Sequence, residues 1–266
     1  MIGLQALHVA VAQGALAAPA LYRLPGLSAL IRDLYGLAGW PVHDLPWSAA
    51  PPSVPFPTPG PVIELRDFAF DPAFRGVAMI DFFLRRLGLD PAGVPPAQRR
   101  NAWLAHRLPA LAPPIPPGYA LLCPQAAMPV RCMPPELATR LESALAARGA
   151  RPVRAPPCAD LASLCAWVAH AAIVVSTDTA MVHLADALAR PCLAFFTTHR
   201  PQWRVRDYPL CHAVHRPIAG AAPALEFATP ADLAASRAAW FDGDAQAAGA
   251  LAWLDPVLDH ALAMGG

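Results

Sequence analysis

The chain contains no lysine, and charged residues make up only 15% of its 266 residues. All 20 basic side chains are therefore arginines. Together with the 33 prolines and the abundant alanine, this composition indicates a bias in the coding sequence rather than a chemical requirement for arginine. The net charge of +1 lacks the basic excess of a nucleic-acid-binding protein. Because 56% of the residues are hydrophobic, the sequence predicts a globular protein with room for two modest domains.

Three further absences narrow the class. The six cysteines include no Cys-x-x-Cys pair, which is typical of reduced thiols in a cytoplasmic protein. No uninterrupted apolar run reaches about 18 residues and no arginine precedes the apolar residues 1–21, so we expect no membrane span or signal peptide and interpret 1–21 as core. No Gly-x-Gly-x-x-Gly follows a predicted strand, which argues against a nicotinamide-dependent oxidoreductase.

One local cluster has the residue types of a metal site. It is Cys211-His212-x-x-His215, with His199 nearby in the sequence. The tetrahedral ligand set is incomplete and the spacing fits no standard zinc pattern. We therefore predict that the protein holds no metal.

Proline marks the organisation of the chain. Eight prolines from Pro41 to Pro61 exclude a regular helix or a central strand and indicate a long surface loop. A second proline cluster, PALAPPIPPG at 109–118, predicts a stiff linker. The linker would join a short N-terminal domain, residues 1–108, to a C-terminal domain, residues 119–266.

The second of these domains alternates strand and helix patterns. Strands are expected at 119–123, 151–154, 172–176 and 192–196, helices between them at 135–148, 160–170 and 179–189, and further helices at 230–240 and 245–263. This alternation predicts a doubly wound α/β domain with a parallel sheet.

The stretch from 171 to 201 has the order of an anion-binding site. An apolar strand pattern at 171–175 is followed by Ser176-Thr177-Asp178-Thr179 and then by apolar residues at helical spacing. A helix start carries unpaired N–H groups and the positive end of the helix dipole, so it can hold a phosphate without a metal or a lysine. Thr177 and Asp178 as ordinary helix caps remain the alternative interpretation.

Two motifs here are similar to a known family. Asp178-Thr179-Ala180-Met181-Val182-His183-Leu184-Ala185, with Ala187-Leu188 and Pro191, resembles the Asp-Thr-Gly-Pro-x-His-Leu-Ala-x-Ala-Leu-x-x-Pro signature of glycosyltransferase family 9. That family contains the ADP-heptose:lipopolysaccharide heptosyltransferases. Upstream, the segments 122–126 (LCPQA) and 130–136 (VRCMPPE) resemble its His-Pro-Gly-Ala and Lys-Arg-Trp-Pro-Pro-Glu segments in the same order and spacing.

The resemblance implies a fold and an activity. The fold would be GT-B-like, with two doubly wound Rossmann-type domains of which the N-terminal, acceptor-side one is reduced. The activity would be metal-independent, inverting transfer of a sugar, for example heptose, from a nucleoside-diphosphate sugar to a bacterial surface glycan or glycoconjugate. An ADP-sugar is the favoured donor, no cofactor is needed, and the protein would work in the cytoplasm or at the inner face of the bacterial inner membrane.

The same resemblance implies a donor site. Its residues would be Gln125, Arg131, Thr177, Asp178, Thr179, Ala180, Met181 and His183. Arg131 replaces the family's lysine near the donor phosphates and keeps its charge, although a solvated loop arginine is the alternative. His183 is interpreted as a packed or supporting histidine before a general base.

The N-terminal half departs from the family pattern. The family opens with a strand and Leu-Gly-Asp, whose aspartate is the expected base, and in the closest match, residues 9–21, Ala15 stands at its position. Asp67, Asp71 and Asp81 are weaker candidates for the base. Residues 153–159 also lack the acidic residue that would hold the ribose.

Two functions therefore stay open. The first is an active glycosyltransferase that recruits its base elsewhere. The second is a catalytically silent relative that binds a nucleotide sugar or a partner protein. A protein partner could also complete the short N-terminal domain.

Overall fold

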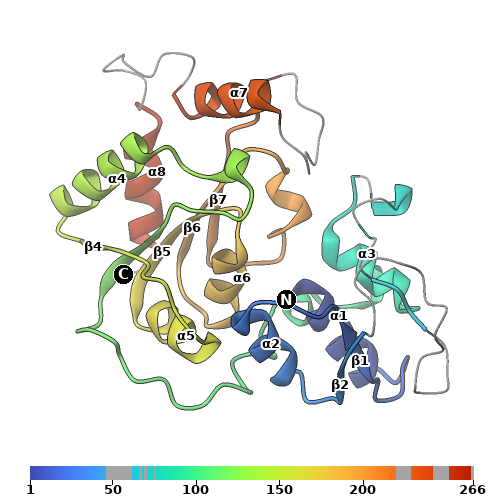
Figure 1. The fold of residues 1–266 in the computed structure, drawn as a ribbon. Helices are drawn as coiled ribbons and strands as arrows, with labels where there is room; N and C mark the ends of the chain where they lie inside the picture. The colour runs from blue at the N-terminus through green and yellow to red at the C-terminus, as the bar shows by residue number, and fades with distance from the viewer. Residues whose placement is uncertain are drawn as a thin grey trace. The chain divides into compact units, whose positions relative to one another are not determined.

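The chain forms two compact units (Figure 1). The structure, a computed structural model, describes residues 1–45, 62–65, 68, 71–74, 76–219, 229–241 and 252–264. One unit comprises Met1–Ala110 and Cys158–Leu164, and the other comprises Leu111–Pro157 and Cys165–Gly266. The segment Cys158–Leu164 thus groups with the N-terminal unit, although it follows the expected linker at 109–118 in the sequence.

The N-terminal unit is a small α/β assembly. Its elements are α1 (Ile2–Ala12), β1 (Leu21–Arg23), α2 (Ala29–Gly36), β2 (Val42–Asp44), α3 (Met79–Arg86) and the 3-10 turns η2 (Pro72–Phe74), η3 (Pro91–Gly93) and η4 (Pro96–Arg99). β1 and β2 form a two-stranded parallel sheet. The core of the unit forms where the buried face of α1 packs with Phe82, Phe83 and Leu84 of α3.

Two N-terminal segments differ from expectation. Residues 2–12 form a helix rather than the strand that opens the family, because their buried positions Ile2, Ala6, Val9 and Ala10 follow the helical period. The segment expected to be a loop from Pro41 to Pro61 contains β2, which lies at the edge of its sheet, where neighbouring prolines are tolerated. Residues 46–61 of that segment lie outside the described residues.

The C-terminal unit contains a five-stranded parallel sheet, which confirms the predicted α/β class. The strands are β3 (Tyr119–Cys123), β4 (Arg151–Arg154), β5 (Ala171–Thr177), β6 (Cys192–Phe196) and β7 (Cys211–His215), in the spatial order β4-β3-β5-β6-β7. Of the five strands in this sheet, β7 is the one that the sequence patterns did not predict. Its residues are the Cys-His-x-x-His stretch considered as a possible metal cluster, and they alternate between the two faces of the sheet.

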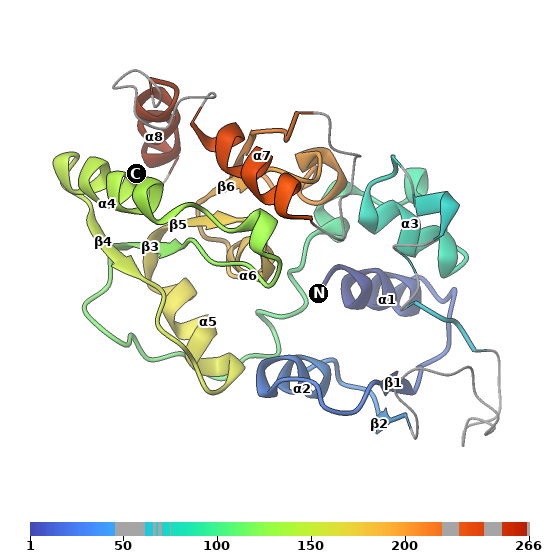
Figure 2. The ribbon, with the colours of Figure 1, turned by 45° about the horizontal axis from the view of Figure 1, so that its top comes forward.

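Helices cover both faces of this sheet (Figure 2). On one face lie α4 (Pro135–Ala147), α7 (Pro230–Trp240) and α8 (Leu254–Ala263), which share a buried core with Leu122, Val175 and Phe195 of the strands. On the other face lie α5 (Leu161–Ala169) and α6 (Ala180–Ala187). Strands covered on both sides are continuously apolar, as the fully buried β3 and β6 are.

The helix after β5 is shorter than expected. It was predicted at 179–189 but ends at Ala187, and Ala189 adopts a left-handed backbone with φ 51°. The Arg190 N–H donates to the Ala185 carbonyl at 2.8 Å. This bond caps the end of α6, and Pro191 then precedes β6. The last helix, expected at 245–263, is described as α8 from Leu254, and residues 242–251 lie outside the described residues.

We predict that Ala189→Gly stabilises the protein. Ala189 is exposed and is the one non-glycine residue with positive φ among the residues that the structure describes. Removing its Cβ relieves about 1 kcal/mol of strain in the left-handed backbone of the folded protein. Glycine also has more conformational freedom in the unfolded chain, which offsets part of this gain. The expected gain in the free energy of unfolding is about 0.5 kcal/mol, measured by urea denaturation. Ala146→Gly, at an exposed position inside α4, is the control and should instead lose up to about 1 kcal/mol. A loss for Ala189→Gly as well would contradict this account.

Candidate functional site

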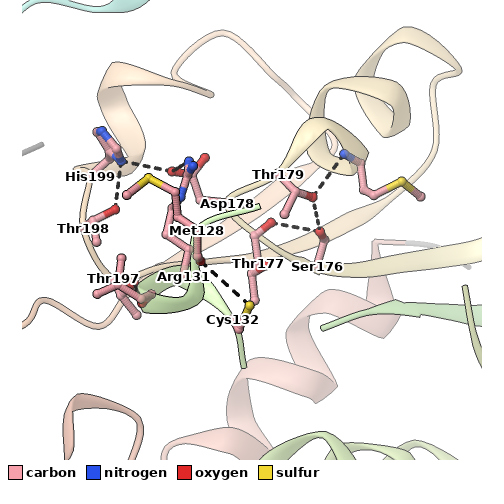
Figure 3. Close-up of polar contacts among 12 residues, drawn as sticks. Met128, Arg131, Cys132, Ser176, Thr177, Asp178, Thr179, Thr197, Thr198 and His199 are labelled. Carbon is pink, nitrogen blue, oxygen red and sulfur yellow. Dashed lines mark hydrogen bonds and ion pairs between the residues drawn. The ribbon is translucent and has the colours of Figure 1, made fainter. Parts of the chain in front are cut away.

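Polar residues from three strands meet at the carboxyl edge of the C-terminal sheet (Figure 3). They come from the loop after β3, the turn between β5 and α6, and the loop after β6. The carboxyl ends of parallel strands lie on one edge, and ligands of open α/β sheets bind there. The sequence predicted the first two loops as site segments, and the third joins them in the structure.

The turn after β5 starts α6. Thr179 is the helix cap, because its Oγ1 accepts a hydrogen bond from the Met181 N–H at 3.2 Å. Ser176 supports the cap, with its Oγ 3.1 Å from Thr179 Oγ1 and donating to the Thr177 carbonyl at 2.8 Å. The interpretation of Thr177 and Asp178 as the caps is therefore wrong. Asp178 has a different set of partners.

Asp178 is a buried carboxylate that joins all three loops. Its side chain is 6% exposed, and its Oδ2 lies 3.1 Å from His199 Nδ1 and 3.5 Å from Arg131 Nη1. Burial alone would raise the pKa of Asp178, but the hydrogen bond and charge of His199, with the charges of Arg204 and Arg131, lower it to about 2. The carboxylate is therefore ionised at neutral pH.

Arg131 is held in place by its neighbours in the chain. It ends the 3-10 turn η5 (Pro129–Arg131), in which the Val130 carbonyl accepts hydrogen bonds from Thr197 Oγ1 at 3.2 Å and from Ser236 Oγ at 2.7 Å. The Cys132 thiol adds a further bond, since its Sγ accepts from the Ala126 N–H at 3.3 Å. The Arg131 side chain is 20% exposed, and its Nη1 faces Asp178.

His199 is the site residue that the sequence patterns missed as a member of this cluster. It is 1% exposed, and Thr198 Oγ1 lies 2.9 Å from its Nδ1. The signal that could have found it is its position three residues after a buried parallel strand, at the edge where the other candidates lie.

The remaining predicted donor-site residues take different positions. Gln125 and Ala180 are exposed, at the loop after β3 and at the first position of α6. Thr177 is fully buried and Met181 is 9% exposed, so the protein covers both side chains almost completely. His183 packs, since its Nδ1 lies 2.8 Å from the Tyr208 hydroxyl and burial lowers its pKa to about 3.

The candidate bases belong to the N-terminal unit. Ala15 is exposed in the turn after α1, so no strand leads to it as the family pattern requires. Asp71 caps η2 through the Ala73 N–H and pairs with Arg86 at 2.9 Å. Asp81 lies 3.8 Å from Arg99, and Asp67 lies outside the described residues.

The residues considered as metal ligands are spread over both faces of β7. The His212 ring packs against His260 of α8 in a tilted arrangement with ring centroids 4.4 Å apart, whereas Cys211 faces the opposite side of the sheet. In the part of the chain that the structure describes, no three His, Cys, Asp or Glu side chains gather as a metal-binding group. None of the helices described there is long and apolar enough to cross a bilayer.

The geometry suits an anion. The exposed start of α6 offers backbone N–H groups and the positive end of its dipole, and the Arg131 guanidinium has donors beyond the one that faces Asp178. The charge of Arg204 also acts on this region. A diphosphate bound there would meet a preorganised guanidinium and a helix start.

Comparison with known proteins places this site in a matched segment. Residues 120–231 match the model of glycosyltransferase family 9 (heptosyltransferase), which confirms the predicted resemblance for that segment. Among solved structures, the E. coli heptosyltransferase WaaC with ADP-2-deoxy-2-fluoro heptose is similar, with 21% identity and a TM-score of 0.38. The similarity covers 51% of this chain and 47% of that one, so this chain spans about half of WaaC. The comparison with curated proteins gave no match.

We predict that Asp178→Asn destabilises the C-terminal unit. The change removes the buried charge that Arg131 faces and the carboxylate acceptor beside His199 Nδ1, which should cost about 2–3 kcal/mol at neutral pH. Because the folded pKa of Asp178 is lowered from 3.8 to about 2, its stabilisation is present above about pH 4 and is lost as the pH falls toward 2. The gap in the free energy of unfolding between wild type and variant should therefore close over that range.

Urea denaturation at neutral and acidic pH measures this gap. Asp259→Asn is the matched control, because that carboxylate also pairs with an arginine, Arg148 at 2.7 Å, but is 66% exposed. It should cost less than about 1 kcal/mol. Equal losses for the two variants would show that burial of Asp178 adds nothing.

Proposed function

We propose that this protein binds a nucleoside-diphosphate sugar at the carboxyl edge of its C-terminal sheet and transfers the sugar to a glycan acceptor. The observation that carries the proposal is the meeting of Arg131 with the start of α6, around the buried Asp178, inside the segment that matches glycosyltransferase family 9. By resemblance, the donor is an ADP-sugar such as an ADP-heptose, and the acceptor is a bacterial surface glycan or glycoconjugate.

The site's charges supply the chemistry on the donor side. When the bond from the sugar to the diphosphate breaks, negative charge develops on the leaving phosphate. The partly exposed Arg131 guanidinium and the α6 N–H groups would stabilise that charge. These groups need no divalent ion, so we propose metal-independent transfer. Attack of the acceptor from the opposite side of the sugar would invert the anomeric centre.

The acceptor side requires a base. A positioned carboxylate is the usual group, and it typically contributes 10²- to 10⁴-fold. Ala15 has no carboxyl group, and it follows a helix rather than a strand. This observation favours a second candidate function, a catalytically silent relative that binds the nucleotide sugar or a partner protein.

We predict that ADP binds the full chain without magnesium and that Arg131→Ala weakens this binding by about 1.5–3 kcal/mol. The loss corresponds to one charge-assisted hydrogen bond to a phosphate. Isothermal titration calorimetry with and without a chelator measures both effects. Strict dependence on a divalent ion would contradict metal-free binding.

Arg140→Ala is the matched control for this titration. Arg140 is an exposed arginine on α4 and is not among the groups whose charges act on Asp178. Its removal changes the net charge by the same amount as Arg131→Ala and should leave ADP affinity unchanged. Equal affinity losses for both variants would assign the effect to overall charge, and no loss for Arg131→Ala would remove Arg131 from the site.

A transfer assay separates the two candidate functions. For the active glycosyltransferase we expect ADP release from ADP-heptose that depends on a glycan acceptor, continues in chelator, and falls 10²- to 10⁴-fold in one of Asp67→Asn, Asp71→Asn or Asp81→Asn. ADP binding by each variant controls for folding. Binding without transfer, together with turnover gained on Ala15→Asp, would instead identify the silent relative.

A further inference from the structure

Two cysteines lie opposite each other on neighbouring strands of the C-terminal sheet. Cys192 begins β6, Cys211 begins β7, and they are register partners in the parallel pair. The Cys192 N–H donates to the Leu210 carbonyl at 2.8 Å, so a backbone hydrogen bond joins the two chain segments next to the cysteine pair. In Figure 1, β6 and β7 lie side by side.

Both side chains point to the same face of the sheet. Leu193, which follows Cys192, belongs to the core shared with α4 and α8, and His212, which follows Cys211, packs against His260 of α8. Because successive residues of a strand face opposite sides, Cys192 and Cys211 face the side covered by α6.

The pair has one buried and one more accessible member. Cys192 is 1% exposed, whereas Cys211 is half-buried, and both cysteines line a small pocket with Asp186, Arg190 and Tyr208. The Cys211 thiol hydrogen-bonds to the Cys192 thiol and, with burial, raises the pKa of Cys192 well above its ordinary value. Cys211 is therefore the thiol that an oxidant in solution meets first.

We propose that Cys192 and Cys211 form a reversible disulfide when the protein meets a peroxide, and that this link is an oxidative modification site. The geometry fits the bond. Neighbouring strands are about 4.8 Å apart, and disulfides join residues whose Cα atoms are about 4.4–6.8 Å apart and whose Cβ vectors do not point apart. Register partners in a parallel pair meet the distance condition, and because both side chains lie on one face their Cβ vectors run side by side.

The step balances with hydrogen peroxide as oxidant. The Cys211 thiolate attacks one peroxide oxygen, the O–O bond breaks, and a sulfenic acid and one water form after proton transfer. The Cys192 sulfur then attacks the sulfenic sulfur, so that the S–S bond forms, the S–O bond breaks and a second water leaves. In sum, two thiols lose two electrons and two protons, and one peroxide becomes two waters.

The link would restrain a loop of the candidate site. Residues 193–210 would be closed into a covalent ring, and they include Thr197, His199 and Arg204, which act on Val130 and Asp178. A closed loop of this length restricts the unfolded chain and so favours the folded state. Oxidation would therefore stabilise the loop that presents His199 to Asp178.

The test uses the reduced full chain treated with a small excess of hydrogen peroxide and then with an alkylating reagent. We expect a mass loss of two hydrogen atoms, a mapped peptide link between Cys192 and Cys211, and a rise in Tm of roughly 5–10 °C that a dithiol reductant reverses. Cys211→Ser and Cys192→Ser should each lose the link and the rise in Tm. Cys158→Ser, at a half-buried cysteine outside the pair, should keep both.

Three results would overturn the proposal. One is full alkylation of both thiols after peroxide treatment. Another is a disulfide that maps to a different pair in the wild-type chain. The third is oxidation of Cys211 that stops at the sulfenic or sulfinic acid while Cys192 stays alkylatable under denaturing conditions. Because Cys211→Ser changes the half-buried member, its folding can be verified even if Cys192→Ser fails to fold.

Discussion

The candidate site depends on the contacts of the ionised Asp178 carboxylate, which is buried where β5 ends. It lies within 3.5 Å of both His199 and Arg131, so it connects the loops that follow β3, β5 and β6. A buried charge is costly unless it is paired, and these two partners with Arg204 more than offset the cost, as the pKa of about 2 records. Asp178 is accordingly a positioning residue. It holds the partly exposed Arg131 beside the buried His199.

The cationic surplus around that carboxylate explains why an anion suits the site. One negative charge is surrounded by Arg131, Arg204 and, when protonated, His199, and the α6 start adds its dipole. The hydroxyls of Thr197 and Ser236 hold the Val130 carbonyl, so the turn that carries Arg131 is set before a ligand arrives. Preorganised donors of this kind stabilise charge without reorganisation, which is the requirement for transfer from a diphosphate.

Sequence patterns predicted the C-terminal unit well because strand and helix patterns alternate along it and its inner strands β3 and β6 are buried on both faces. The expected strands 119–123, 151–154 and 192–196 are confirmed with their bounds. The weakly patterned β7 was missed because its partly exposed Cys-His-x-x-His residues lack the apolar run of the inner strands. Residues 9–21 were matched to the segment that opens the family with a strand, but this match begins inside α1, whose buried positions follow the helical period. The role of His199 could not be predicted from local sequence, since the contact joins residues that are 21 positions apart.

We propose that the carboxyl edge of the C-terminal sheet binds the diphosphate of a sugar donor. A crystal structure of the full chain with ADP tests it most directly. The account predicts diphosphate oxygens within hydrogen-bonding distance of the Arg131 guanidinium and of the N–H groups that begin α6, with the Asp178 to His199 contact retained. ADP bound at another edge of the sheet, or a diphosphate that touches neither Arg131 nor the start of α6, would contradict it.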